Sequence, residues 1–184
     1  MSDLVPKGER RRVVTGWDAD GRATIVADGP APVTVESAAF DVVETWRLGG
    51  LPADFGPAET VIGAPAMEPG EGEVLFRFAY FAPDPGGPEA WEEAMAAMAA
   101  SATLSGGGDA GSHTTDTLDH ILVVSGRISL IVEDSTVDLE AGDVVVQRGT
   151  PHTWINRSEE PCVTLAVQVP ADPSTRPQRK GGSA

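Results

Sequence analysis

Short apolar runs, closely spaced and separated by turn residues, extend from Thr117 to Val169 and constrain the fold most strongly. The runs cover residues 117–125, 127–133, 136–140, 143–147, 153–156 and 163–169. Each has the length and alternation of a strand, and Gly126 and Gly142 stand in the gaps between runs. The gaps are too short for crossover helices, so the strands must pair antiparallel in a sandwich or barrel.

The N-terminal part of the chain adds a hairpin, two further strands and a helix. Residues 11–17 and 22–27 flank a turn with Gly21, which predicts a β-hairpin, and residues 40–48 and 74–81 read as strands. Residues 88–100 begin with proline and are rich in alanine, which predicts one short helix. In that helix Trp91, Met95 and Met98 recur at helical spacing, either as a packing stripe or as part of a lid hinged at residues 106–108.

The length of 184 residues suits one domain. We expect a single domain over residues 11–170, with the core barrel at 74–170 and N-terminal strands at 11–48. Residues 49–72 are expected to form an irregular connection. We expect a mobile tail at 1–10 and a disordered tail at 171–184, because both ends are polar or rich in proline and glycine.

Charge and composition exclude several classes of protein. The net charge is −15 and the basic residues crowd the two ends, so a nucleic-acid partner is not expected. No apolar run is long enough to cross a membrane, and the first residues lack the apolar stretch of a secretory signal. A single cysteine, Cys162, rules out an internal disulfide, and together these features predict a cytoplasmic protein without a membrane partner.

The candidate site lies between Gly111 and Asn156, the window that holds all three histidines. If one strand begins at His113, then His113, Thr115, Thr117 and Asp119 share a face, and His120 points away. His152 follows three strands later and returns beside His113. Two histidines and one carboxylate can hold zinc, iron or manganese, or act without metal as an acid–base pair.

Further side chains are candidates for contact with a substrate. Thr115 and Thr117 could orient a substrate oxygen, Trp154 shares the parity of His152 and could form an aromatic wall, and Gln168 is a polar residue between two valines. Each could equally be a structural lining residue. Arg148 could pair with a substrate carboxylate or form a structural salt bridge, and Asn156 could hold its own loop.

These residues resemble the two motifs of the cupin superfamily, which are small antiparallel jelly-roll β-barrels. Gly149, His152 and Asn156 match the second motif at G-x2-H-x3-N, although Gln147 stands where that motif has proline. In the first motif His113 takes the first histidine position and Gly126 closes the motif. The departures are Thr115 in place of the second histidine and Asp119 in place of the glutamate.

The chain also resembles single-domain cupins of the conserved-barrel type, with the motifs H-x-T-x-T-x-D and Q-R-G-T-x-H-x-W-x-N. The resemblance implies an all-β jelly-roll barrel with an N-terminal hairpin extension and one short helix. It implies a divalent metal in the typical case, for which at most His113, Asp119 and His152 remain as ligands here.

The expected function is that of a small-molecule enzyme using His113, Asp119 and His152, with or without a divalent metal. The resemblance implies lyase chemistry (decarboxylation or dehydration), isomerisation or cyclisation, and dioxygenation. The reduced ligand set favours a lyase (decarboxylase or dehydratase), or a cyclase or isomerase, acting on a small organic substrate such as an aromatic or polyketide-like molecule. The alternatives are a ligand-binding or sensor cupin without catalysis, and a non-haem iron dioxygenase. The N-terminal strands predict a homodimer formed by strand exchange.

Overall fold

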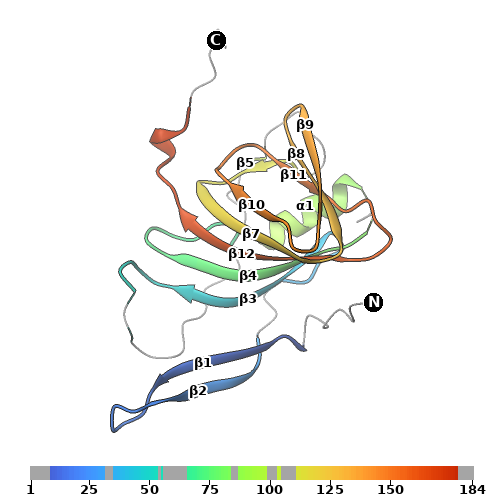
Figure 1. Ribbon diagram of the computed structural model, residues 1–184. Coiled ribbons are helices and arrows are strands. Elements are labelled where there is room, and N and C mark those ends of the chain that lie inside the picture. Colours follow the sequence, from blue (N-terminus) through green and yellow to red (C-terminus); the bar gives the residue numbers. More distant parts are fainter. Residues whose placement is uncertain are drawn as a thin grey trace.

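The structure is a computed structural model that describes residues 9–31, 35–53, 55, 66–83, 87–98, 103–104 and 111–177. Strands predominate and the described part contains one α-helix (Figure 1). The first strands and the helix are β1 (Arg11–Trp17), β2 (Ala23–Pro30), β3 (Phe40–Leu48), β4 (Val74–Phe81) and α1 (Pro88–Ala97). The remaining strands are β5 (Thr103–Leu104), β6 (His113–Thr114), β7 (Thr117–Ser125), β8 (Arg127–Val132), β9 (Ser135–Glu140), β10 (Val144–Gln147), β11 (Thr153–Ile155) and β12 (Cys162–Pro170).

Two antiparallel sheets form the barrel, which confirms the predicted all-β class. The larger sheet has the strand order β10-β7-β12-β4-β3, and the smaller has the order β11-β8-β9. β12 is the central strand of the larger sheet and pairs with both β7 and β4. A main-chain bridge between His113 and His152 joins β6 to the chain just before β11. The two ends of the segment from Gly111 to Asn156 are therefore held together at one end of the barrel.

The turn glycines occupy the conformation that their positions require. Gly126 has φ 79° and lets β7 turn directly into β8. A Cβ atom at this position would lie 2.6 Å from the carbonyl oxygen of Pro161. Gly142 has φ 99° in the turn before β10, with open space around it. Only glycine adopts these angles without steric cost, so both glycines act as structural turn residues.

Helix α1 packs against one end of the barrel. Pro88 occupies its first turn, as the sequence predicts, and Glu89 lies near its positive N-terminal end. Trp91, Met95 and Met98 are buried with Phe40 and Val42 in one apolar cluster. The stripe therefore packs onto the barrel. Residues 106–108, the expected hinge of a lid, lie outside the described residues, as do residues 99–100 of the expected helix.

The hairpin β1–β2 projects from the barrel (Figure 1). At its base Arg10 donates a hydrogen bond of 2.6 Å to the hydroxyl of Tyr80 and lies over the ring of Phe78, 4.6 Å from its centroid. Further along, Val13, Trp17 and Ile25 are about half exposed, at 48%, 59% and 53%. None of the described helices has the length and apolar character needed to cross a membrane.

The expected single strand from His113 to Asp119 is broken in the structure. β6 ends at Thr114 and β7 begins at Thr117, because β6 pairs with β5 and the His152 segment whereas β7 pairs with β10 and β12. The chain passes from one pairing partner to another at Thr115–Asp116. All four side chains of the predicted face are nevertheless buried, and His120 is exposed, as the parity predicts.

Candidate functional site

The centre of the candidate site is the pair His113 and His152. Their main chains exchange two hydrogen bonds of 3.0 Å, which sets the two residues directly opposite each other. The ring centroids are 4.4 Å apart, and the side chains are 8% and 4% exposed. Trp154 stands edge-on to His152 with centroids 6.0 Å apart. The structure therefore brings together two histidines that are distant in the sequence.

Each histidine is held through one ring nitrogen. The Nδ1 atom of His113 lies 2.8 Å from the carbonyl oxygen of Gly111, and that of His152 lies 2.9 Å from the carbonyl oxygen of Thr150. A carbonyl oxygen can only accept, so each Nδ1 carries the proton and donates. In the neutral ring this leaves Nε2 with a free lone pair, which can accept a proton or bind a ligand.

Burial keeps both imidazoles neutral. Desolvation lowers the pKa of His152 to about 3, with a smaller contribution from the nearby charge of His113. Desolvation also lowers the pKa of His113, although the hydrogen bond to Gly111 and the charge of Asp119 oppose that shift. Near neutral pH the pair is therefore uncharged.

Asp119 lies on β7 directly opposite Gln168 of β12. The amide nitrogen of Gln168 donates a hydrogen bond of 3.1 Å to Oδ2 of Asp119. Burial raises the pKa of Asp119, against the opposing effect of the neighbouring side chains of Thr117 and Gln168. Oδ1 of Asp119 and Oε1 of Gln168 are both buried without a hydrogen-bond partner. These two polar atoms are therefore available to form hydrogen bonds with a ligand in the site.

Thr115 and Thr117 have different positions. The hydroxyl of Thr117 donates to that of Thr115 over 2.8 Å, and both side chains are 2% exposed. Thr115 lines the barrel cavity, whereas Thr117 does not. Thr117 therefore supports Thr115 and Asp119 from behind, and only Thr115 can contact an occupant.

His113, Thr115, Asp119 and His152 border a cavity of about 90 Å³ inside the barrel. Trp154 and Gln168, both predicted as contact residues, line it together with Trp91 and Met95 of α1 and with Met98, which follows the helix. Aromatic side chains form much of the wall: ring centroids are 5.7 Å apart for Phe40 and Trp91, and 6.2 Å apart for Phe81 and Trp154. The cavity therefore combines a large apolar wall with a small polar region, which is typical of small-molecule sites.

Sequence reasoning missed one polar residue of the cavity, Arg77 of β4. Its side chain is 6% exposed and lines the cavity. The available signal was an arginine inside a continuous apolar strand, at the same parity as Ala79 and Phe81. Arg148, the arginine that the sequence offered for a carboxylate, is exposed beside an outer groove and does not line the cavity.

The predicted three-ligand metal centre is not assembled. In the part of the chain that the structure describes, no three side chains among His, Cys, Asp and Glu form a group that could hold a metal ion. His113 and His152 are adjacent, but Asp119 is bonded to Gln168. The donors present therefore fit a two-histidine pair with free Nε2 atoms, and they do not fit a centre of two histidines and one carboxylate.

Three other residues have structural roles. Asn156 donates to the carbonyl oxygens of Phe81 and Glu160, at 3.1 and 2.8 Å, and so fastens its own loop. Cys162 is buried, and burial raises the pKa of its thiol to about 12, so the thiol is inert. His120 is exposed and takes no part in the cavity.

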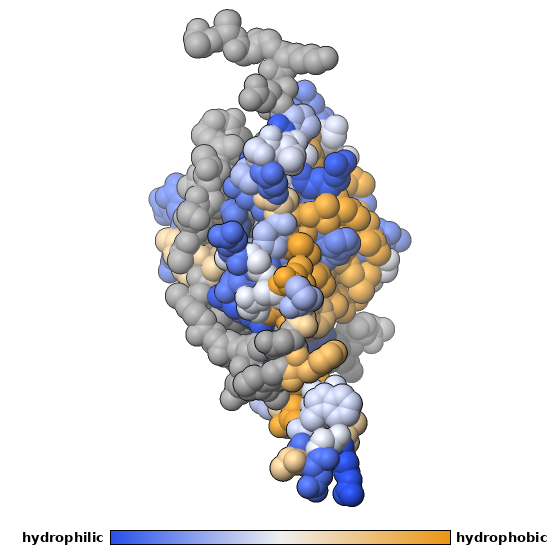
Figure 2. Space-filling model, turned by 90° about the vertical axis from the view of Figure 1, so that its left-hand side faces the viewer, coloured by the Kyte–Doolittle hydropathy of each residue, from blue (hydrophilic) through white to orange (hydrophobic). Residues whose placement is uncertain are grey.

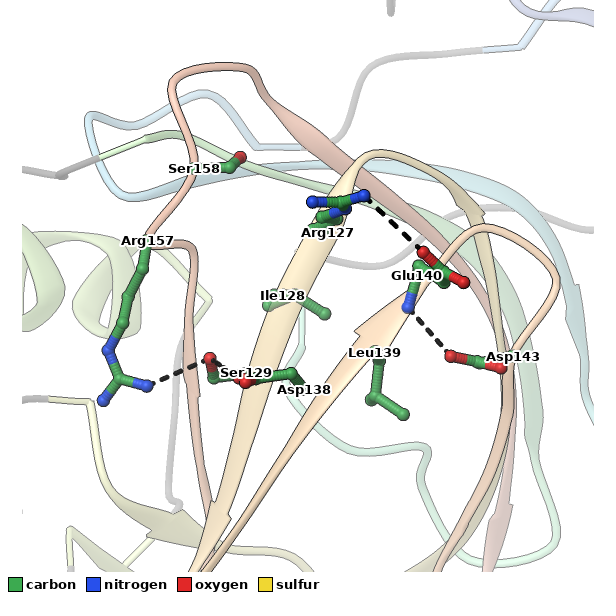
Figure 3. Close-up of a pocket in the computed structure, with 9 residues that line it drawn as sticks. All are labelled: Arg127, Ile128, Ser129, Asp138, Leu139, Glu140, Asp143, Arg157 and Ser158. Carbon is green, nitrogen blue, oxygen red and sulfur yellow. Dashed lines mark hydrogen bonds and ion pairs between the residues drawn. The ribbon is translucent and has the colours of Figure 1, made fainter.

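A second hollow lies on the β8–β9 hairpin (Figure 3). Arg157 donates to Ser129 over 3.0 Å, Ser129 donates to Asp138 over 2.6 Å, and Arg127 lies 3.8 Å from Glu140. The charged groups thus pair with one another, and none of the predicted site residues lines this hollow.

Comparisons with known proteins agree with this architecture. A family model described as a cupin domain matches residues 100–168. Phomopsin biosynthesis cluster proteins C' and D of Diaporthe leptostromiformis are each 44% identical to the chain over 54 residues. The match covers 28% of this chain and only 28% of either relative.

Two solved structures similar to the chain are a Cupin 2 conserved barrel domain protein from Salinispora arenicola CNS-205 and the Cnp3 cupin domain of Schizosaccharomyces pombe. The first is 16% identical, with 78% of this chain and 84% of that chain covered and a TM-score of 0.42. The second is 8% identical, with 87% of each chain covered and a TM-score of 0.45.

Proposed function

We propose, from the premise that this chain belongs to the cupin superfamily, that its barrel is a small-molecule lyase that works by proton transfer. The substrate is a small organic molecule that loses water or carbon dioxide. Related proton transfers would make it an isomerase or cyclase. The residues that carry the chemistry are His113, Asp119 and His152.

One observation carries the proposal: two neutral imidazoles present free Nε2 atoms at a largely apolar cavity that a buried carboxyl group also lines. A free imidazole nitrogen can remove a proton from carbon. A carboxyl group whose pKa is raised by burial can donate one. Such a pair of unlike groups in one enclosed site is the arrangement that acid–base catalysis requires.

In a dehydration, Nε2 of His113 takes the proton next to the substrate's electron-withdrawing group, and that bond's electron pair forms the new double bond. The leaving hydroxyl departs as water with the proton of Asp119. In a decarboxylation, the bond to the carboxylate breaks, carbon dioxide leaves, and the carbanion takes its proton from the acid. His152, whose pKa of about 3 makes it the weaker base, accepts a hydrogen bond and orients the substrate.

The surrounding side chains support this chemistry. Trp154 and Phe81 provide an apolar wall against which a planar substrate can lie. Thr115 can hydrogen-bond a substrate oxygen from the edge of the cavity. The names of the two Diaporthe relatives place those proteins in a biosynthesis cluster, which supports work on a small organic molecule here.

The second candidate function is a ligand-binding barrel without catalysis. It is favoured by the low pKa of His152, because a weak base serves better as a hydrogen-bond acceptor than as a proton carrier. In that case the same residues would set affinity and no turnover would be observed.

The test follows turnover of a panel of small keto and hydroxy acids by proton NMR. We expect His113→Ala and Asp119→Asn to lower kcat/KM by about 100-fold or more, the usual effect of losing a general acid or base. His152→Ala should also lower kcat/KM, because it removes the hydrogen bond that orients the substrate. His120→Ala, at an exposed position on the same strand as Asp119, should keep full activity. Full activity in His152→Ala and His113→Ala on a turned-over substrate would sink the proposal.

The family resemblance implies zinc, iron or manganese. The content of these metals in the purified protein can be measured directly. Plasma mass spectrometry of the purified protein, beside His113→Ala and His152→Ala, reports whether the histidine pair retains any of them. Oxygen consumption with iron(II) and substrate would identify the dioxygenase alternative.

The chain is also proposed to form a homodimer through its hairpin and the outer face of the larger sheet. Figure 2 shows apolar side chains gathered in one area of the barrel surface, with the hairpin projecting beyond it. Phe76, Leu122, Val144 and Val146, on strands of the larger sheet, are 37%, 37%, 68% and 53% exposed. Apolar residues on both faces of a sheet favour an outer cover, and the exposed apolar side chains of β1 and β2 in a second copy can supply it.

A further inference from the structure

Arg77 is a buried cation without a contact partner of opposite charge in the described ranges. Its two terminal nitrogens donate to the main-chain carbonyls of Ala66, at 2.7 Å, and Met67, at 2.5 Å. Glu44, which lies opposite Arg77 in the β3–β4 pairing, forms its ion pair with Arg47, and together with Asp119 it favours the charged form of Arg77 by Coulomb attraction. Both hydrogen bonds go to neutral groups, so the positive charge itself is not neutralised by contact.

A buried charge of this kind is costly unless an anion compensates it. Burial lowers the pKa of Arg77 to about 10, so the side chain is still charged near neutral pH. Arg77 lines the same cavity as His113 and Asp119. An anionic group in that cavity would supply the missing contact.

Two other polar atoms of the cavity, Oε1 of Gln168 and Oδ1 of Asp119, lack a hydrogen-bond partner rather than a counter-charge. Oε1 of Gln168 is buried without a partner and can only accept, so it needs a donor. Oδ1 of Asp119 is also buried without a partner, and it accepts when ionised and can donate when protonated. A hydroxyl group can donate to Gln168 and suits either form of Asp119, because it both donates and accepts.

We infer that the barrel cavity binds a small hydroxy acid, with its carboxylate at Arg77 and its hydroxyl at Asp119 and Gln168. The carbon skeleton would lie against the apolar wall formed by residues such as Phe40, Ile121 and Trp154. The space of about 90 Å³ in the cavity suits a small ligand. The inference rests on the proposed function, because it names the substrate class of the same cavity.

A cation beside Asp119 would not satisfy the same set of groups. It could bind Oδ1 of Asp119, but it would add a second positive charge to a cavity that already contains Arg77. Among the described residues, Arg77 would still have no contacting anion. An organic anion with a hydroxyl group would place a carboxylate at Arg77 and a hydrogen-bonding hydroxyl at Asp119 and Gln168.

The experiment titrates three matched probes into the purified full chain and follows backbone amide shifts by NMR. The probes are 3-hydroxybutyrate, its neutral amide 3-hydroxybutyramide, and butyrate, which lacks the hydroxyl. We expect 3-hydroxybutyrate to bind at least tenfold more tightly than either of the other two, with shifts around the cavity. Equal affinity for the acid and the amide, or no saturable binding of the acid, would overturn the inference.

Variants locate the charge that the acid recognises. Arg77→Met should weaken binding of 3-hydroxybutyrate at least tenfold and leave the amide unaffected, and Arg77→Lys should keep part of the preference. Arg127→Met removes a cation that is exposed on the outer surface and should change nothing. If Arg77→Met fails to fold, the probe series on the unaltered protein together with Arg77→Lys still decides.

The outcomes separate this inference from the proposed function. Binding of the hydroxy acid that depends on Arg77, but without turnover of any acid, would support the inference and contradict the lyase. Turnover of a neutral substrate that is insensitive to Arg77→Met would support proton-transfer chemistry and contradict the inference.

Discussion

The titratable residues of the cavity are tuned by burial more than by neighbouring charges. Desolvation is the largest cause of the lowered pKa of His113 and His152, of the raised pKa of Asp119, and of the lowered pKa of Arg77. In the described part of the chain, one main-chain carbonyl bound to Nδ1 orients each imidazole. Because these carbonyls fix the tautomer, both Nε2 atoms are available to an occupant of the cavity.

The pKa of His152 predicts how stability depends on pH. The unfolded chain binds a proton at this residue near pH ~6.5, whereas the folded chain does so only near pH 3. Stability present above pH ~6.5 is therefore lost as the pH falls below that value, at about 1.4 kcal/mol per pH unit for one proton. We expect His152→Gln to show a shallower loss between pH 7 and pH 5.

Thermal unfolding at several pH values checks this prediction. The comparison uses the difference between the unaltered protein and the variant, since the raised pKa of Asp119 acts in the opposite direction in both. His120→Gln, at an exposed site, should leave the slope unchanged. An identical slope in His152→Gln and the unaltered protein would contradict the prediction.

At the scale of the elements, the β7–β8 turn has no room for a side chain at Gly126. Gly126 has φ 79°, and a Cβ atom added to it would lie 2.6 Å from the carbonyl oxygen of Pro161 and 2.9 Å from Cα of Cys162. The main chain of β12 therefore approaches this turn more closely than any side chain would allow. The turn and the start of β12 are packed as one unit, close to the core that contains Cys162.

Substitution of this glycine should be costly. We expect Gly126→Ala to lower the free energy of unfolding by about 2 to 4 kcal/mol, from the positive φ and from the clash with the main chain. Chemical denaturation measures the effect. Gly142→Ala is the matched control, because it also has a positive φ but has open space around it, so its loss should be smaller. Equal losses of unfolding free energy in the two variants would show that the close contact at Gly126 does not contribute to the destabilisation.

The surface of the molecule carries exposed apolar side chains that packing within the barrel does not account for. Exposed apolar side chains occur on β1, β2, β4, β7 and β10. We expect the protein to elute as a dimer in size-exclusion chromatography with light scattering, and Val13→Asp in β1 to shift it toward a monomer. The reason is that a carboxylate would be buried without a partner in the proposed contact.

The control for the dimer lies on the other sheet. Val137 of β9 is 48% exposed, as is Val13, so Val137→Asp introduces the same charge at the same exposure. It should leave the dimer intact. A monomer for the unaltered protein at all concentrations, or dissociation in both variants alike, would argue against the hairpin contact.

The amino-acid sequence by itself determined the strands, the turns and the helix. Strand alternation and turn glycines depend on nearest neighbours, so the runs at 40–48, 74–81 and 117–125 became strands with the predicted bounds. The two motifs also identified His113, Asp119 and His152 as buried groups of one barrel.

Only the tertiary structure decided how these groups combine. Strand parity could not show that β6 separates from β7, because that break depends on which distant strands the two segments pair with. Nor could it show that Asp119 is bonded to Gln168 and that Arg77 enters the cavity. These contacts join β4, β7 and β12, and the register between strands far apart in the chain exists only once the barrel has closed.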